Sequence, residues 1–191
     1  MKKFSLKVLF ITSIIVFTGC AIPSTPSSSN THNAPTKIST KIDKNKQFQI
    51  YKIPLSVTQL IDSDKKYHSD KELELLINEK LIALLKKENY LTTKTDANII
   101  MITVSYERRF VGDKTPIPST SLSYPKFEYS IDLHNQTKSI AKIKKSKYSY
   151  KGNLALTKKV ISKTLDKKTD EMQFIDALVN SIFNDIKNLQ Y

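Results

Sequence analysis

Three polar residues on one short segment have side chains that hydrolases use for catalysis. Ser130, Asp132 and His134 alternate with apolar residues, which is typical of one face of a β-strand. Side chains two residues apart on a strand lie about 6.5–7 Å apart, so we expect these three to stay beyond hydrogen-bond reach of one another. The sequence contains no zinc, redox, nucleophile-elbow or phosphate-loop motif, and it has only 3 glycines. We therefore expect no enzymatic activity, no catalytic residue, no metal and no cofactor.

A pair of arginines is the other unusual feature of the sequence. Arg108 and Arg109 are the only arginines among 31 basic residues, and they precede a loop that contains Pro116 and Pro118. The planar guanidinium binds carboxylates in a bidentate manner and stacks on aromatic rings better than a lysine does. In one interpretation, these four residues form a candidate partner surface.

The other interpretation of the arginines is structural. Arg109 would pair with Glu107 on the same strand face, and Arg108 would stack on Tyr106 or Phe110. The sequence leaves both interpretations open.

The only cysteine is Cys20, and it ends a segment that reads MKKFSLKVLFITSIIVFTGC. A basic start, a short apolar run and small residues before the cysteine are typical of a secretory signal peptide. Residues 17–20 resemble the lipobox of bacterial lipoproteins, although Phe17 stands where leucine is usual. The resemblance implies that residues 1–19 are a cleaved signal peptide and that Cys20 receives the lipid that holds the chain on a membrane.

The residue after the cysteine bears on localisation. In the Gram-negative lipoproteins that this start resembles, a residue other than aspartate there favours the outer membrane, and here it is Ala21. We expect an anchor in the outer membrane, with the periplasmic face favoured over the cell surface.

The formal net charge of +13 suggests an anionic partner. Nucleic-acid readers rely on arginine for bidentate contacts, and this chain is rich in lysine instead. We expect no nucleic acid. The partners that fit are the membrane, an envelope protein, and anionic lipid or lipopolysaccharide.

The mature chain divides into a tether and one domain. Residues 20–46 follow the signal and are rich in Ser, Thr, Pro and Asn, which is typical of a disordered segment. Residues 47–191 form a single domain.

Apolar spacing within that domain indicates an α+β fold. It predicts a two-layer sandwich of a largely antiparallel sheet with two amphipathic helices. Residues 154–168 are ambiguous between helix and irregular structure. The second half of strand 98–111 turns polar, so we expect it to extend beyond the part of the sheet that covers the core. We expect His68 at the surface. The expected helices are 69–88 and 170–189. A capping box at Ser69 and Glu72 begins the first of these helices, and Asn89 ends it. The expected strands are 47–53, 90–95, 98–111, 126–135 and 139–150.

Three segments of this domain follow a pattern found in small Gram-negative lipoproteins. They are LIALLKKENY at 81–90, DANIIMITV at 96–104 and IDALVNSIFNDI at 175–186. The chain resembles the YajG-type lipoproteins and, more loosely, the HpaA-type lipoprotein adhesins. The resemblance implies a non-enzymatic envelope binding or assembly protein, with a surface-displayed adhesin as the alternative, and it assigns no functional residue.

Overall fold

The computed structural model describes residues 47–62, 67–135, 137–150 and 152–189. The predicted signal peptide, Cys20 and the tether lie outside the described residues. Within the described ranges, no helix is long and apolar enough to cross a membrane. The elements are β1 (Phe48–Ile50), β2 (Leu55–Gln59), α1 (Asp70–Lys87), β3 (Asn98–Arg108), β4 (Lys126–Asn135), β5 (Lys138–Ser149), α2 (Leu154–Ile161) and α3 (Lys168–Asn188).

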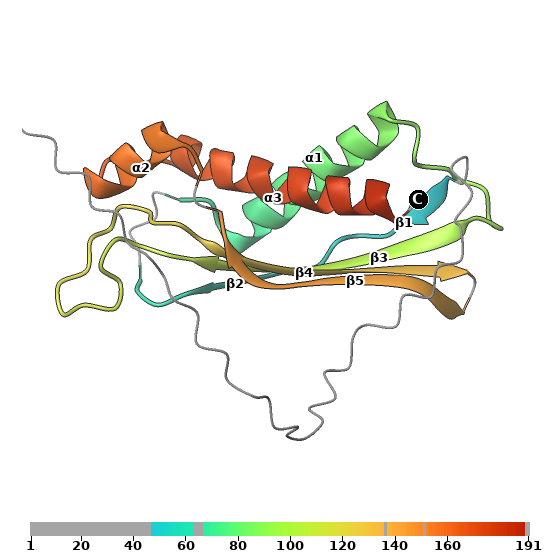
Figure 1. The fold of residues 1–191 in the computed structure, drawn as a ribbon, viewed down its shortest axis with the longest axis horizontal. Helices are drawn as coiled ribbons and strands as arrows, with labels where there is room; N and C mark the ends of the chain where they lie inside the picture. The colour runs from blue at the N-terminus through green and yellow to red at the C-terminus, as the bar shows by residue number, and fades with distance from the viewer. Residues whose placement is uncertain (1–46, 63–66, 136, 151, 190–191) are drawn as a thin grey trace, which may run out of the picture. The chain divides into compact units, whose positions relative to one another are not determined.

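The strands form one mixed sheet with β3 near its centre. On one side of β3 lies β4, antiparallel to it, and β5 pairs in turn with β4 in the antiparallel sense. On the other side, β1 and β2 both run parallel to β3, β1 beside Asn98–Ile100 and β2 beside Val104–Arg108. Figure 1 shows the helices on one face of the sheet. The predicted α+β class is therefore confirmed, although two strand pairs are parallel and there are three helices.

Alternating side chains on β3 and β4 build the core against the helices. Tyr106, Phe127 and Tyr129 are buried, because every second residue of these strands faces the helices. Their rings contact one another or Tyr148 in tilted and edge-to-face pairs. The helices contribute the other half of the core through Leu73, Ile77, Leu81 and Leu85 of α1 and Phe174, Ile175, Leu178, Ile182 and Ile186 of α3.

The first predicted strand is wrong in its extent. The residues expected to form one strand at 47–53 form only β1, and a second strand, β2, follows Pro54. Pro54 lies between the two strands and does not end the sheet. Its carbonyl accepts a hydrogen bond from the Val104 amide of β3 at 3.1 Å, so the chain stays beside β3 at the proline. The alternation Leu55-Ser-Val-Thr-Gln then continues along β3.

The predicted strand at 90–95 is also wrong. Only Leu91 forms a bridge there, with Phe48 of β1. Two backbone hydrogen bonds, Phe48 N–H to the Tyr90 carbonyl and Thr92 N–H to the Phe48 carbonyl, join this segment to β1, and a turn follows. Strand β1 has only 3 residues, so it is too short to pair with a longer strand at 90–95.

Two further details of the sequence pattern are settled. The ambiguous stretch 154–168 consists of helix α2 and an irregular segment after it. The second half of β3 does not leave the covered core, because Tyr106 and Arg108 are both buried. The expectation that this half extends beyond the core is therefore wrong.

The capping box at the start of α1 is confirmed, and it carries a pH-dependent contact. Glu72 accepts hydrogen bonds from the Ser69 amide at 2.7 Å and from Lys168 Nζ at 2.7 Å. The Lys168 contact, followed by the bonds from Ser69, lowers the pKa of Glu72 to about 2. The end of the helix also follows the prediction, since Asn89 has a positive φ of 60°.

This contact predicts an acid-dependent difference in stability. A carboxylate with a lowered folded-state pKa stabilises the fold above its ordinary pKa of 4.5 and loses that contribution as the pH falls through about 2. Glu72→Gln should therefore lower the urea midpoint at pH 7 and match the wild type near pH 2. Glu79→Gln, an exposed acid on the same helix, is the control and should show no such change. An equal Glu72→Gln deficit at both pH values would contradict the assignment.

Candidate functional site

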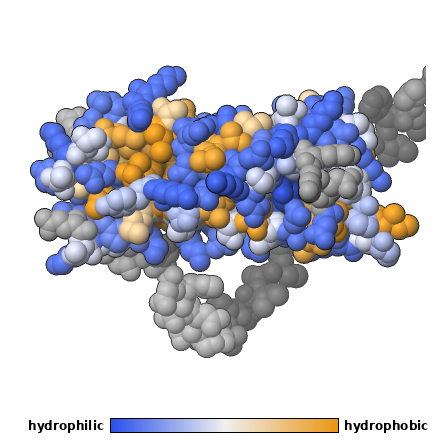
Figure 2. All heavy atoms as spheres, turned by 180° about the vertical axis from the view of Figure 1, so that it is seen from behind, coloured by the Kyte–Doolittle hydropathy of each residue, from blue (hydrophilic) through white to orange (hydrophobic). Residues whose placement is uncertain are grey.

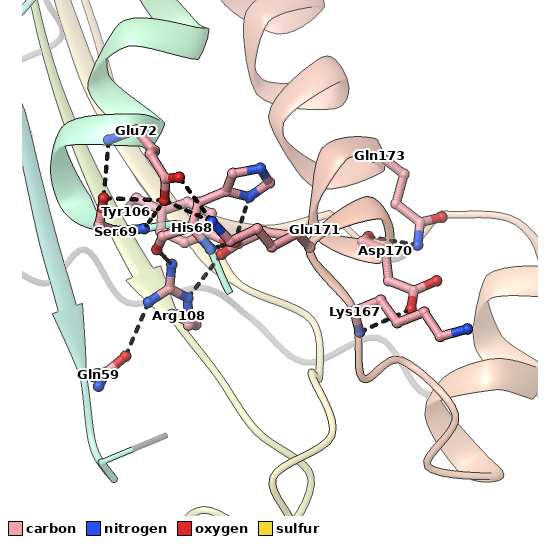
Figure 3. Close-up of polar contacts among 11 residues, drawn as sticks. Gln59, His68, Ser69, Glu72, Tyr106, Arg108, Lys167, Asp170, Glu171 and Gln173 are labelled. Atoms are coloured by element: carbon pink, nitrogen blue, oxygen red, sulfur yellow. Dashed lines mark hydrogen bonds and ion pairs between the residues drawn. The ribbon is translucent and has the colours of Figure 1, made fainter. Parts of the chain in front are cut away.

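A buried carboxylate, Glu171 in the first turn of α3, is the centre of a polar cluster (Figure 3). Its Oε1 accepts hydrogen bonds from Arg108 Nε at 2.8 Å and from the Tyr106 hydroxyl at 3.0 Å. Its Oε2 accepts from the His68 amide at 3.1 Å and lies 3.0 Å from His68 Nδ1. The carboxylate thus contacts four polar atoms from three residues, Arg108, Tyr106 and His68.

Each nitrogen of the Arg108 guanidinium donates a hydrogen bond within the domain. Nη1 donates to the Gln59 side chain at 3.1 Å, and Nη2 donates to the His68 carbonyl at 2.6 Å. Its Cζ lies 5.8 Å from the ring centre of Tyr67 and 6.0 Å from that of Tyr106. The contact with Tyr106 is one that the structural interpretation of the arginines predicted. Arg108 lies inside the fold rather than on an open surface.

This cluster connects elements and offers no reactive group. Burial raises the pKa of Tyr106 well above its ordinary value, so the hydroxyl stays protonated as a donor to Glu171. Burial likewise raises the pKa of Tyr67 to about 12. The expectation of a surface His68 is wrong, because its ring is largely buried against Glu171. The arrangement joins β2, β3, the start of α1 and the start of α3.

Arg109 points to the other side of the strand and holds the following loop. Its Nε and Nη2 donate to the two carboxylate oxygens of Asp113, and Nη1 donates to Glu107 at 3.2 Å. The hydrogen bond from Arg109 lowers the pKa of Asp113, which therefore remains charged at neutral pH. Asp113 also accepts from the Phe110 amide at 3.1 Å. The pairing with Glu107 expected from the sequence is present, and Asp113 is the partner that the sequence analysis missed.

The loop that follows is closed by its own hydrogen bonds. Val111 N–H donates to the Ser121 carbonyl at 2.9 Å, and Ser119 N–H donates to the Val111 carbonyl at 2.8 Å. Gly112 has a φ of 73°, where a Cβ would also meet Thr115 Oγ1 at 3.0 Å, so this position favours glycine. Pro116 and Pro118 are exposed on this loop and flank Ile117.

Four exposed aliphatic side chains lie near the end of the sheet where β2 and β3 finish. We call Leu60, Ile117, Leu154 and Ile161 the strand-end surface; their exposed fractions are 55%, 89%, 71% and 75%. Figure 2 shows apolar atoms in separate patches, one projecting from the end that carries the loop 112–120, at the right of that view. Large exposed apolar patches mark binding surfaces, and here the exposed side chains come from several segments at one end of the sheet.

Hydrogen bonds between distant segments place these four residues at the same end. Leu122 N–H donates to the Leu165 carbonyl at 2.7 Å, which joins the end of the loop to the segment after α2. The hydroxyl of Tyr124 donates to Thr157 Oγ1 of α2 at 2.9 Å. Gln59, next to Leu60, contacts Arg108 of β3. The strand-end surface is therefore built from three separate segments held by one scaffold.

A shallow groove of about 330 Å³ lies between α1 and α3. Leu84 and Val179 are among its apolar lining residues, and Lys80 and Asp176 form an ion pair of 2.9 Å beside it. The ion pair joins the two helices, and the groove is the space left between their side chains. It brings together no group with evident chemistry.

The residues that suggested a hydrolase do not form a triad. His134 Nε2 lies 3.1 Å from Asp132 Oδ1, so the expectation that these two side chains stay out of reach is wrong. The hydroxyl of Ser130 instead shares a 2.7 Å hydrogen bond with Thr103, and none joins it to His134 in the described part of the chain. Nor do the described residues contain a group of three potential metal ligands.

Comparison with known proteins adds one distant similarity. No protein-family model matches the chain, and no curated protein is significantly similar to it. The crystal structure of the rare lipoprotein B from Shewanella oneidensis matches with 20% sequence identity, covers 72% of this chain and 99% of its own, and has a TM-score of 0.27. A superposition that loose transfers neither fold nor function. The resemblance to YajG-type and HpaA-type lipoproteins stays a prediction.

The structure separates the four residues of the candidate partner surface. Arg108 is buried and Arg109 is bonded to acids, whereas Pro116 and Pro118 are exposed. Sequence reasoning missed Glu171, although it falls on the same helical stripe as Ile175 and Leu178, which is a detectable signal for a buried acid.

Proposed function

We propose that this chain is a non-enzymatic lipoprotein of the bacterial envelope. In this proposal a lipid on Cys20 holds it at the outer membrane, on the periplasmic side, and the domain binds another envelope component. The observation that supports binding is the strand-end surface, where four large aliphatic side chains are each more than half exposed. Burying such side chains against a partner is favourable by about 1.5–3 kcal/mol each before the costs of association.

The polar groups near this surface support binding rather than catalysis. Glu171 accepts hydrogen bonds from three residues of the domain, Arg108 donates three hydrogen bonds within it, and Asp113 is paired with Arg109. A general base needs a lone pair that points at a substrate. The internal bonds also keep the loop around Ile117 ordered, which lowers the entropy cost of binding through it.

The anchor in the proposal rests on the sequence of residues 17–20 and on the length of the following segment. Residues 21–46 number 26, and a flexible chain of that length has an r.m.s. reach of about 25–30 Å. The domain would therefore stay close to the membrane that holds the lipid, where envelope components are concentrated.

Photo-crosslinking in cells tests the binding surface. A photoreactive amino acid in place of Ile117 or Leu154 should give adducts with another envelope component, because both positions lie on the strand-end surface. The control is Met101, which is 52% exposed on the sheet face opposite the helices and should give none. Adducts from Met101 alone would contradict the assignment of the surface, and adducts with a molecule outside the cell would favour the adhesin alternative.

A further inference from the structure

We infer that the component bound by the strand-end surface is an anionic phospholipid bilayer, into whose interface the four aliphatic side chains insert. This inference rests on the proposed function, because it names the partner of that same surface. It adds a second membrane contact to the one proposed through Cys20. The contact is made by the folded domain and needs no lipid on the chain.

Helix α2 supplies the first observation. It spans only 8 residues, yet it is apolar on two sides. Leu156 faces the core and is buried, while Leu154 and Ile161, seven residues apart and so on one helical face, are exposed to solvent. Lys158 lies between them on that face. A bilayer interface could take up the two aliphatic side chains of this face, while the flexible Lys158 side chain reaches the head groups.

The second observation is the loop, which presents Ile117 at the same end. Ile117 is the most exposed of the large apolar residues at 89%, between two prolines, in a loop closed by its own hydrogen bonds. A water-exposed isoleucine at an ordered tip gains by entering an apolar phase and loses little conformational freedom when it does so.

The third observation is the charge around these side chains. Residues 154–168 contain five lysines and one acid. Lys159 and Lys168 form ion pairs with Asp170 and Glu72, whereas Lys158 and Lys163 have no acidic partner within the described residues. Lysines beside inserted apolar residues attract the phosphates of anionic head groups, each by about 1 kcal/mol near the surface.

The kind of residue favours lipid over a protein partner. Protein interfaces depend on central aromatic and arginine anchors that fill pockets of the partner. Here both arginines are used inside the fold, and the exposed residues are aliphatic and project from three separate segments. Lysine is a flexible, strongly hydrated point charge, which suits a fluid layer of head groups that has no fixed geometry.

The anchor permits this contact. The chain enters the domain beside β1, which pairs with the first residues of β3, so it enters at the opposite end of β3 from the strand-end surface. The length of β3, 11 residues, is about 36 Å, whereas 26 extended residues span up to about 90 Å. The strand-end surface can therefore reach the bilayer that carries the lipid.

Vesicle sedimentation tests the inference with the full mature chain carrying Cys20→Ala, so that no lipid is attached. We expect binding to phosphatidylcholine vesicles that contain one-quarter phosphatidylglycerol, and at least about tenfold weaker binding to phosphatidylcholine alone. Adding Ile117→Ser, Leu154→Ser and Ile161→Ser together should weaken binding by at least about tenfold. The matched control, Leu75→Ser with Met101→Ser, removes two side chains that are 51% and 52% exposed elsewhere and should bind within about twofold of the parent.

Several results would overturn the inference. These are no binding to the phosphatidylglycerol vesicles, equal binding by the triple variant, or binding only when the vesicles contain lipopolysaccharide. If vesicle binding fails but Ile117 and Leu154 still crosslink to an envelope protein, the proposed function stands and the bilayer is wrong. If both fail, the strand-end surface is not a binding surface.

Discussion

Replacing Glu171 by alanine is expected to lower the free energy of unfolding by about 3–5 kcal/mol. The change removes one member of a buried ion pair and leaves the Arg108 guanidinium charged and without its carboxylate. It also removes the acceptor for the Tyr106 hydroxyl and for the His68 amide. The energetic cost lies mainly in the buried donors that lose their partner, since each unsatisfied buried polar group costs about 1–3 kcal/mol.

Urea unfolding followed by circular dichroism measures this effect. Asp176→Asn is the matched control, because Asp176 lies on the same helix and forms an ion pair with Lys80, but its side chain is half exposed. An exposed pair contributes about 0–1 kcal/mol, so the control should unfold close to the wild type. Similar losses from the two variants would show that the Glu171 cluster does not brace the fold.

Replacing Cys20 by alanine is expected to abolish membrane attachment through lipid. Cys20 carries the only thiol in the chain, and in the proposal its sulfur is the atom that receives diacylglycerol. Two or more acyl chains anchor a protein firmly, and without them only the weak interfacial contact of the domain would remain. Metabolic labelling with a fatty-acid analogue measures whether the chain carries lipid. Fractionation at high salt then measures how much of the chain stays with the membrane.

Ser24→Ala is the control for that experiment, because it changes a polar residue close to Cys20 and leaves the thiol in place. It should retain the label and stay in the membrane fraction. Label retained by the Cys20→Ala protein would contradict lipidation at this residue.

The sequence was informative where local spacing determines the structure. Alternation along residues 126–133 identified the buried face of β4, with Ser130 and Asp132 on the other face. Ser69 and Glu72 identified the first turn of α1, because their reciprocal hydrogen bonds depend on residues three apart. These signals need no knowledge of distant contacts.

The predictions failed where distant segments meet. Arg108 and Glu171 are 63 residues apart, so the sequence left the role of the arginine open. The strand β2 was missed because Pro54 was taken as the end of the strand region, whereas the edge of a sheet tolerates a proline between two short strands. The parallel pairing of β1 and β2 with β3 likewise depends on the path of α1 across the sheet.

The candidate site was predicted in part, for a similar reason. Pro116 and Pro118 marked a loop that is exposed, but the sequence could not say that Leu154 and Ile161 face outward. In a helix of 8 residues, either apolar stripe could cover the core. Contacts from Tyr124 and Leu122 determine which side is covered, and they come from a segment some 30 to 40 residues away.

The central claim is a division of roles, in which Arg108 stabilises the fold and the strand-end surface makes the contact. The most direct test compares the adduct yield from a photoreactive residue at Leu154 in two backgrounds, Arg108→Lys and Ile117→Ser with Ile161→Ser. Arg108→Lys should melt earlier, because lysine cannot make the contacts to Glu171, Gln59 and His68 together, but it should keep most of its yield below its melting temperature. The serine variant should melt like the wild type and lose most of its yield. The reverse pattern, with yield lost in Arg108→Lys and kept in the serine variant, would contradict the division of roles.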